Sequence, residues 1–177
     1  MIIKIIQRYM PEYIKKKKLN ELFRLTADAF QTEMPALRGL TFQERLSLYA
    51  FFSREQAERS LQGGCPIEEV KSRLYENSFV FGKNLRKSLH IISWEESITA
   101  LRMIYQMIGV DFRYEGQGEF IIKQCYYSNY YTSEVCILIS TMDQGLAAGL
   151  TGGEKLHFTQ RITDGSSCCK GYFKYDY

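Results

Sequence analysis

Residues Asp111–Tyr127, DFRYEGQGEFIIKQCYY, are the point at which the chain changes from one type of structure to another. Asp111–Glu115 and Glu119–Tyr127 have extended character, and the Gly116-Gln117-Gly118 sequence between them is typical of a turn. We therefore expect an antiparallel hairpin here.

Upstream of this hairpin, helical spacing predicts four helices. Pro11 suits the first turn of a helix that runs to about Phe30. Thr41-Phe-Gln-Glu44 is a capping-box sequence, in which the threonine hydroxyl and the glutamate carboxylate each accept a backbone N–H. The helix that it starts continues to Gly63-Gly64.

Two further helices complete this part of the chain. Cys65-Pro66 opens the third, whose apolar pattern extends to Leu89. Ser93-Trp-Glu-Glu96 is a second capping box, and Gly109 ends the helix behind it. That helix carries an amphipathic stripe at helical spacing, formed by Trp94, Ile98, Leu101, Tyr105 and Ile108.

Downstream of the hairpin, Glu134–Gly149 returns to helical spacing. Glu154–Thr163 and Cys168–Tyr175 form a second pair of strands around Asp164-Gly165. The sequence therefore predicts one α+β domain over residues 1–177, with a helical half (1–110) and a sheet-containing half (111–177). We expect about four N-terminal helices, packed on a small antiparallel sheet in the order strand, strand, helix, strand, strand.

The charge of the chain is small but unevenly spread. The formal net charge is +3, with an excess of six positive charges in residues 1–90 and of three negative charges in residues 91–177. Lys15–Lys18 stand among helix-forming residues with acidic neighbours, which favours a solvated helix face over a nucleic-acid-binding patch. We expect no nucleic-acid partner.

Hydropathy and cysteine content indicate the cellular compartment. No stretch approaches the ~18 uninterrupted apolar residues of a membrane span, and the initial MIIKII is too short for a signal sequence. The five cysteines are odd in number and irregularly spaced, unlike a secreted disulfide framework. We therefore expect a cytoplasmic protein with reduced thiols and no membrane partner.

A polar row lies on the predicted helix Glu134–Gly149. Cys136, Ser140 and Asp143 are four and three residues apart, so they share one face and can contact a polar ligand. The alternative is that Cys136 is a small buried hydrophobe and Asp143 is solvated or capped. Gly145 and Gly149 suggest a close approach of another backbone. The apolar stripe expected to face the core consists of Val135, Leu138, Met142 and Leu146.

The strand Leu156–Thr163 has a second polar side, formed on alternation by His157, Thr159, Arg161 and Thr163. Such a side either meets solvent or lines a pocket. Arg161 can bind a carboxylate in a bidentate manner, and His157 can transfer a proton near neutral pH. On the earlier strand, alternation places Lys123, Cys125 and Tyr127 on one face, which puts another thiol on the same sheet.

Cys168 and Cys169 are adjacent, and we expect them to have different roles. Neighbouring residues of a strand point to opposite faces, so we expect one thiol to pack in the core and the other to line a site. A structural zinc site is disfavoured because the chain has no CxxC spacing and only two histidines. A nucleophilic thiol needs a base or cation beside it, for which His157 and Arg161 are candidates.

The strings VCILISTMDQGLAAGLTGG and LHFTQRITDGSSCCKGYF resemble the C-terminal half of bacterial proteins related to L-2-amino-thiazoline-4-carboxylic acid hydrolase. Those proteins have an acidic residue on a helix, then an Arg/Thr-rich strand segment, and then Gly-x-x-x-Cys before an aromatic residue. The same outline resembles the 4-vinyl-reductase-type domain, whose fold is shared with trafficking-particle subunits. The matching positions are Asp143, Arg161, Thr163, Gly165, Cys169 and Phe173.

The hydrolase resemblance implies ring opening or C–N hydrolysis of a small carboxylate-bearing compound that contains nitrogen or sulfur. Arg161 would anchor the carboxylate, Asp143 would act as general base or orient the substrate, and Cys169 or Cys125 would supply a thiol. His157 is a further proton-transfer candidate, and neither a cofactor nor a metal is implied. The remaining substrate-binding candidates are Cys136, Ser140, Thr163 and Tyr127.

The vinyl-reductase-type resemblance implies another class, a non-catalytic module that binds a small ligand or dimerises. The pocket would then be apolar and lined by tyrosine and phenylalanine, and the polar row would face solvent or a dimer interface. The four tyrosines at positions 126, 127, 130 and 131 suit an interface as well as a pocket. We expect a homodimer with a small-molecule ligand.

Overall fold

The computed structural model describes residues 10–64 and 66–175 and confirms the α+β class. The expectations for MIIKII and for Cys65 lie outside the described residues. Single turns of other helix types cover Ser60–Gly64, Tyr126–Asn129 and Ile162–Asp164. The main elements are α2 (Glu12–Phe30), α3 (Phe42–Arg59), α4 (Ile67–Ser88), α5 (Trp94–Met107), β1 (Val110–Gly116), β2 (Glu119–Cys125), α6 (Ser133–Ile139), α7 (Thr141–Thr151), β3 (Glu154–Gln160) and β4 (Cys169–Tyr175).

Both predicted capping boxes are present. The Thr41 N–H donates to the Glu44 carboxylate over 2.7 Å, and the Glu44 N–H donates back to the Thr41 hydroxyl over 3.3 Å. Ser93 and Glu96 make the same reciprocal pair at 3.2 Å each. Each box satisfies backbone donors that a helix start otherwise leaves unpaired, which is why α3 and α5 begin where the sequence predicts.

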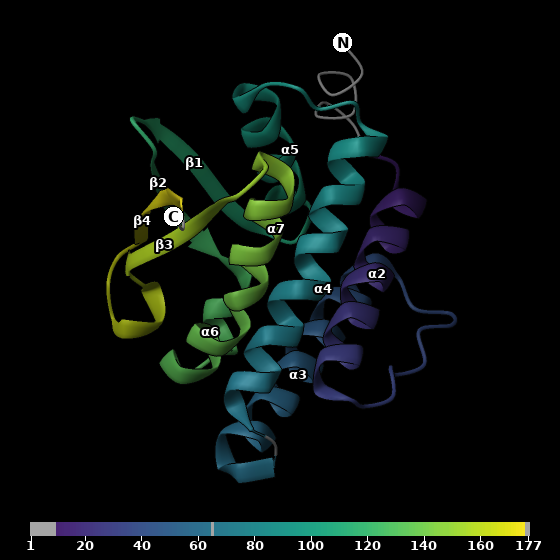
Figure 1. The fold of residues 1–177 in the computed structure, drawn as a ribbon. Coiled ribbons are helices and arrows are strands. Elements are labelled where there is room, and N and C mark those ends of the chain that lie inside the picture. The colour runs from purple at the N-terminus through teal and green to yellow at the C-terminus, as the bar shows by residue number, and fades with distance from the viewer. Residues whose placement is uncertain (1–9, 65, 176–177) are drawn as a thin grey trace.

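The sheet has the strand order β1-β2-β4-β3, with antiparallel neighbours throughout. In Figure 1, α7 lies between this sheet and α4, and α2 lies on the far side of α4. Under α5, the rings of Phe112, Phe120 and Phe173 pack against one another with centroids 5.5 to 6.5 Å apart. Burying each such ring stabilises the fold by roughly 1.5–3 kcal/mol.

The close approach predicted at Gly145 and Gly149 is confirmed, and it joins α7 to α4. A Cβ atom at either position would lie under 3.0 Å from backbone atoms of α4, at Tyr75 and Phe79 respectively. A Cβ on Gly82 of α4 would in turn lie 2.5 Å from the Leu146 carbonyl oxygen. The two helices therefore pack backbone against backbone, which only glycine at these positions allows.

The predicted single helix Glu134–Gly149 is instead two helices that meet at Ser140. The Ser140 hydroxyl donates to the Ile137 carbonyl oxygen over 2.9 Å, a side-chain bond that competes with the helical pattern and bends the chain. Cys136, Ser140 and Asp143 nevertheless all line the same cavity.

Two β-bulges change the faces predicted from strict alternation. In the β1–β2 pair, Ile122 lies opposite Phe112 and Cys125 lies opposite Val110. The interval is three residues along β2 but only two along β1, so β2 contains one extra residue. In β3, Phe158 pairs with Gly171, and Gln160, two residues on, pairs with the adjacent Lys170. Each extra residue turns the side chains that follow it to the other face of the sheet.

Because of these bulges, two sets of side chains that were predicted to share a face do not share one. Lys123 is exposed, whereas Cys125 lies with Ile122 on the inner face, so the prediction that Lys123, Cys125 and Tyr127 share a face is wrong. His157 is exposed on the outer face, with its ring centroid 4.8 Å from that of Tyr172. Arg161 lies on the inner face with Phe158, so the predicted polar side of His157 and Arg161 does not exist.

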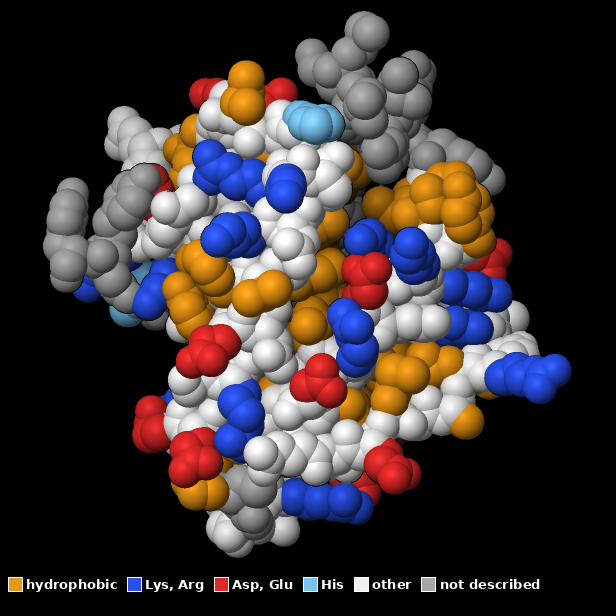
Figure 2. Space-filling model, turned by 45° about the vertical axis from the view of Figure 1, so that its right-hand side comes forward, with side chains coloured by type: hydrophobic (Ala, Val, Ile, Leu, Met, Phe, Trp, Pro, Cys, Tyr) orange, Lys and Arg blue, Asp and Glu red, His pale blue; other side chains and the backbone are white. Residues whose placement is uncertain are grey.

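Most lysines of the run Lys15–Lys18 in α2 contact acidic or aromatic side chains of the protein. Lys16 pairs with Glu12 at 3.0 Å and Lys18 with Glu21 at 2.8 Å, and Lys15 lies over the ring of Phe42. On the face shown in Figure 2, Lys and Arg side chains are interspersed with Asp and Glu. No helix among the described residues combines the length and hydropathy that crossing a bilayer requires.

Candidate functional site

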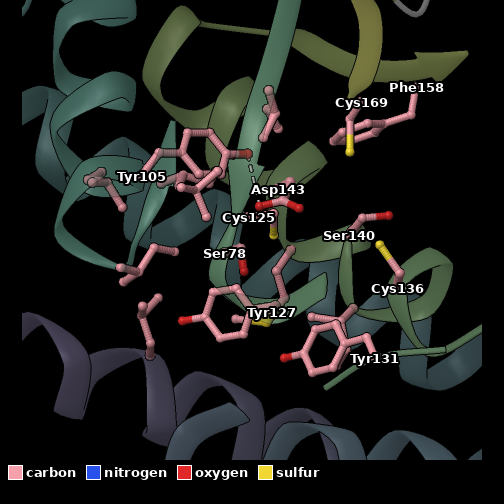
Figure 3. Close-up of a pocket in the computed structure, with 18 of the residues that line it drawn as sticks. Ser78, Tyr105, Cys125, Tyr127, Tyr131, Cys136, Ser140, Asp143, Phe158 and Cys169 are labelled. Carbon is pink, nitrogen blue, oxygen red and sulfur yellow. Dashed lines mark hydrogen bonds between the residues drawn. The ribbon is translucent and has the colours of Figure 1, made fainter. Parts of the chain in front are cut away.

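A cavity lies at the centre of the molecule, and every helix and strand named above contributes to its wall. The volume open to the centres of water-sized spheres is about 100 Å³. This volume is similar to that of an apolar cavity of ~150 Å³ that binds benzene. Most of the wall is aliphatic or aromatic, and Figure 3 labels polar side chains that interrupt it, among them Ser78, Ser140 and Asp143. The aromatic part consists of Tyr49, Phe81, Tyr105, Tyr127, Tyr131 and Phe158.

Asp143 reaches this cavity from the first turn of α7. Its Oδ1 accepts a hydrogen bond of 2.9 Å from the hydroxyl of Tyr105 on α5 (Figure 3), and no other described residue donates to its carboxylate. Burial raises the pKa of the Asp143 carboxyl to about 6, while the Tyr105 hydrogen bond and the charge of Arg161 act in the opposite direction. The carboxylate is therefore mostly ionised at neutral pH, although it titrates unusually close to it.

Arg161 directly follows the bulged strand β3, and its side chain lines the same cavity. Its Nη2 donates to the Ser140 hydroxyl over 3.0 Å and its Nη1 to the Cys136 sulfur over 3.7 Å. The guanidinium carbon lies 4.2 Å from the ring centroid of Phe158, in a cation–π contact. Three side chains thus fix the orientation of the guanidinium, and its other N–H groups are left without a partner among the described residues.

The two charges do not form a direct ion pair. No ion pair within 4.0 Å joins Asp143 or Arg161 to any oppositely charged side chain in the described part of the chain. Opposite charges that share an apolar enclosure normally pair directly, because an uncompensated charge there is costly. Here each charge is held in place by a neutral partner instead, Tyr105 for the carboxylate and Ser140 for the guanidinium.

Three thiols line the cavity, and all three are held in the protonated form. Burial raises the pKa of Cys125 to about 12, and it also raises the pKa of Cys136 and of Cys169. The Cys169 sulfur accepts the Ile162 N–H over 3.3 Å. Since the thiolate is the nucleophilic form, this environment works against covalent catalysis by any of the three.

We therefore expect slow alkylation of Cys125, Cys136 and Cys169 by iodoacetamide at neutral pH, with no one of them reacting much faster than the others. Peptide mass spectrometry over time measures each rate in the native protein, and the same reaction in denaturant gives the rate of an unhindered thiol. If any one of these three cysteines reacted in the native protein as fast as in the denatured control, that would contradict its protonated, buried state.

Of the nine site residues predicted from sequence, seven share the cavity and two do not. His157 lies on the outer face of the sheet, as described above. Thr163 lies beside the Cys136 thiol but outside the cavity wall. The seven that meet are Cys125, Tyr127, Cys136, Ser140, Asp143, Arg161 and Cys169.

Cys168 and Cys169 have different surroundings, as expected for adjacent strand residues. Cys169 lines the cavity, whereas Cys168 is buried elsewhere and its sulfur accepts from the Gln160 side chain over 3.4 Å. The four cysteines of the described chain are all free thiols. Among residues 10–64 and 66–175, no three histidine, cysteine, aspartate or glutamate side chains lie close enough together to hold a metal ion.

Tyr105 and Ser78 are polar residues of the wall that were not among the candidates predicted from the sequence. Tyr105 counts there only as a member of an apolar stripe, and its phenol group on an otherwise aliphatic face was the available signal. Ser78 of α4 gives no sequence signal, since a lone serine in a helix has no distinguishing pattern. A scan of the chain against models of known protein families finds no match, and no curated protein matches it significantly.

Proposed function

We propose that the cavity binds a small carboxylate-bearing nitrogen compound, whose carboxylate meets Arg161 and whose N–H or ammonium group meets Asp143. The observation that carries this proposal is the pair of opposite, unpaired charges in one apolar cavity. A ligand with both groups neutralises both charges, and a compact ring or aliphatic body fills the space between the aromatic walls.

The guanidinium is well prepared for a carboxylate. Its contacts with Ser140, Cys136 and Phe158 hold its plane, so little conformational entropy is lost when a second planar group binds. The apolar wall strengthens this charge-assisted interaction because it excludes water. The size of the cavity favours a ligand of one ring or a short chain.

A test of this proposal uses L-2-amino-thiazoline-4-carboxylate and its decarboxylated analogue as probes in calorimetric titrations. Arg161→Gln is expected to weaken binding of the carboxylate probe by at least about 30-fold, because it leaves a buried carboxylate without its partner. The same substitution should leave binding of the decarboxylated analogue nearly unchanged.

Arg113→Gln is the matched control, because Arg113 is an exposed strand residue that pairs only with Asp111. It should bind both probes as the wild type does. Equal binding of the carboxylate probe by the wild type and Arg161→Gln, in folded proteins, would remove the carboxylate site from this cavity.

A second candidate function is hydrolysis of the same compound, and the pKa of Asp143 favours it. A carboxylate with a pKa of about 6 can accept a proton from water near neutral pH. In this reaction water adds to the C=N carbon, and Asp143 takes a proton from the water and passes it to the ring nitrogen. The ring C–S bond then breaks, the sulfur leaves with the electron pair and takes the proton of the new hydroxyl group, and a carbonyl group remains. Mass spectrometry of the titration mixtures detects the ring-opened product, which should be absent with Asp143→Asn.

A further inference from the structure

Two buried hydroxyl groups of the cavity wall have no hydrogen-bond partner in the described part of the chain. They belong to Ser78 of α4, which is 2% exposed, and to Tyr127, which is 7% exposed. A buried hydroxyl without a partner is unfavourable, and native proteins rarely retain one without a reason. Both residues line the cavity that the proposed ligand would occupy.

The unpaired state of Ser78 distinguishes it from three other buried serines of this fold. The hydroxyls of Ser53, Ser97 and Ser140 each donate to a backbone carbonyl oxygen three or four residues earlier in the chain. Ser78 also lies within a helix, where the same bond is available, but it does not make it. Its hydroxyl is thus left for a partner in the cavity.

Tyr127 is equally exceptional in its own segment. The hydroxyl of Tyr126 bonds to Ser47 over 2.8 Å and to Tyr130 over 3.0 Å, and that of Tyr131 bonds to Ser53. Helix α3 therefore supplies partners for the neighbouring tyrosines and none for Tyr127. Burial raises the pKa of the Tyr127 phenol well above its usual value, so the group remains a hydroxyl donor.

The two hydroxyls lie away from the anion-binding side of the cavity. In Figure 3, Ser140 and Cys136, which hold Arg161, lie on one side of the view, and Ser78 and the Tyr127 hydroxyl lie on the other, with Asp143 between. A ligand anchored by its carboxylate at Arg161 extends across the apolar space toward Ser78 and Tyr127.

From this arrangement we infer that Ser78 and Tyr127 form a second polar subsite, which binds a hydroxyl or carbonyl oxygen at the end of the ligand opposite its carboxylate. The inference rests on the proposed function and narrows it. The ligand is then an amino-acid-like compound with an apolar body and a distal oxygen. Sites of this kind discriminate strongly against analogues that lack the distal oxygen, since the buried hydroxyls then remain unpaired.

Matched probe pairs test this subsite. L-tyrosine and L-phenylalanine differ only in a distal hydroxyl, and 6-hydroxy-L-norleucine and L-norleucine form the corresponding aliphatic pair. In calorimetric titrations of the wild type, the hydroxylated member of at least one pair should bind about tenfold more tightly. In the double variant Ser78→Ala/Tyr127→Phe that ratio should fall to near one, while binding of the member without a hydroxyl is retained.

Two controls separate the subsite from general effects of substitution. Tyr126→Phe removes a tyrosine hydroxyl that already has partners outside the cavity wall, so it should keep the wild-type preference. Without any ligand, Ser78→Ala and Tyr127→Phe should melt at the same or a higher temperature than the wild type, whereas Ser97→Ala should melt lower.

The outcomes distinguish the inference from the function on which it rests. Binding of the probes with no preference for the hydroxylated members, or a preference that survives in the double variant, overturns the subsite alone. A lower melting temperature of both single variants does the same, because it shows that the hydroxyls already have partners. No binding of these four probes or of L-2-amino-thiazoline-4-carboxylate overturns the proposed function together with the subsite.

Discussion

Gly149→Ala is expected to lower the free energy of unfolding by about 3 kcal/mol, which is near the upper end for overpacking a protein interior. The new Cβ would meet the Phe79 carbonyl oxygen and the Lys83 nitrogen of α4 at under 3.0 Å, and the Gly82 carbonyl carbon at 3.0 Å. These are backbone atoms, so no rotamer change relieves the contact and α7 has to move away from α4. Denaturant unfolding of both proteins measures the difference.

Helix propensity acts in the opposite direction, which makes the result easy to interpret. Alanine is more favourable than glycine in a helix interior by ~1 kcal/mol, so a large loss can come only from the contact between the helices. Gly39→Ala serves as control, because Gly39 has a φ of +82° and no atom within 4 Å of the added Cβ. It should lose only about 1 kcal/mol through backbone strain. Equal losses for both variants would disprove backbone contact as the cause.

Asp143→Asn is expected to raise the stability of the protein at neutral pH, by up to about 3 kcal/mol. The carboxyl has a pKa of about 6 when folded, against ~3.9 when unfolded. The folded protein therefore binds more protons than the unfolded chain between about pH 4 and pH 6, and its stability falls as the pH rises through that range. Asparagine removes the charge and keeps an oxygen that can accept from Tyr105.

Unfolding free energies across this pH range provide the measurement. The wild type should lose stability from about pH 4 to pH 6, and Asp143→Asn should lack that contribution. Asp111→Asn is the matched control. The Arg113 side chain holds the pKa of Asp111 below its usual value, so that carboxyl stays ionised over most of the range and its removal leaves the slope in place. If the unfolding free energies of the wild type and Asp143→Asn changed equally with pH, the pKa of Asp143 would not be raised by burial.

The features of the fold that are predictable from the sequence are those governed by near neighbours in the chain. The capping boxes at Thr41 and Ser93 involve residues three positions apart, and the Gly116-Gln117-Gly118 turn involves consecutive ones. The end of the helix at Ser140 is harder to predict from the sequence, because a serine hydroxyl in a helix can point to solvent or bond to the preceding turn. Only packing decides between these two.

The site is predictable to the extent that it follows helical periodicity. Cys136, Ser140 and Asp143 are brought together by spacing alone, whereas Arg161 and Cys125 reach the cavity through β-bulges. A bulge depends on how two strands pair, which the sequence of one strand does not reveal. For the same reason His157, which simple alternation places beside Arg161, lies on the opposite face of the sheet.

The bulges of β2 and β3 make the inner surface sensitive to chain length as well as to residue type. Deleting one residue from the bulged part of β3 would leave the strand order intact but direct a different side chain inward in place of Arg161. Homologous chains that differ here by a single insertion or deletion would then share a scaffold while presenting a different charge to the cavity. Such length variants offer a route to divergent specificity that leaves the apolar interior of the domain unaltered.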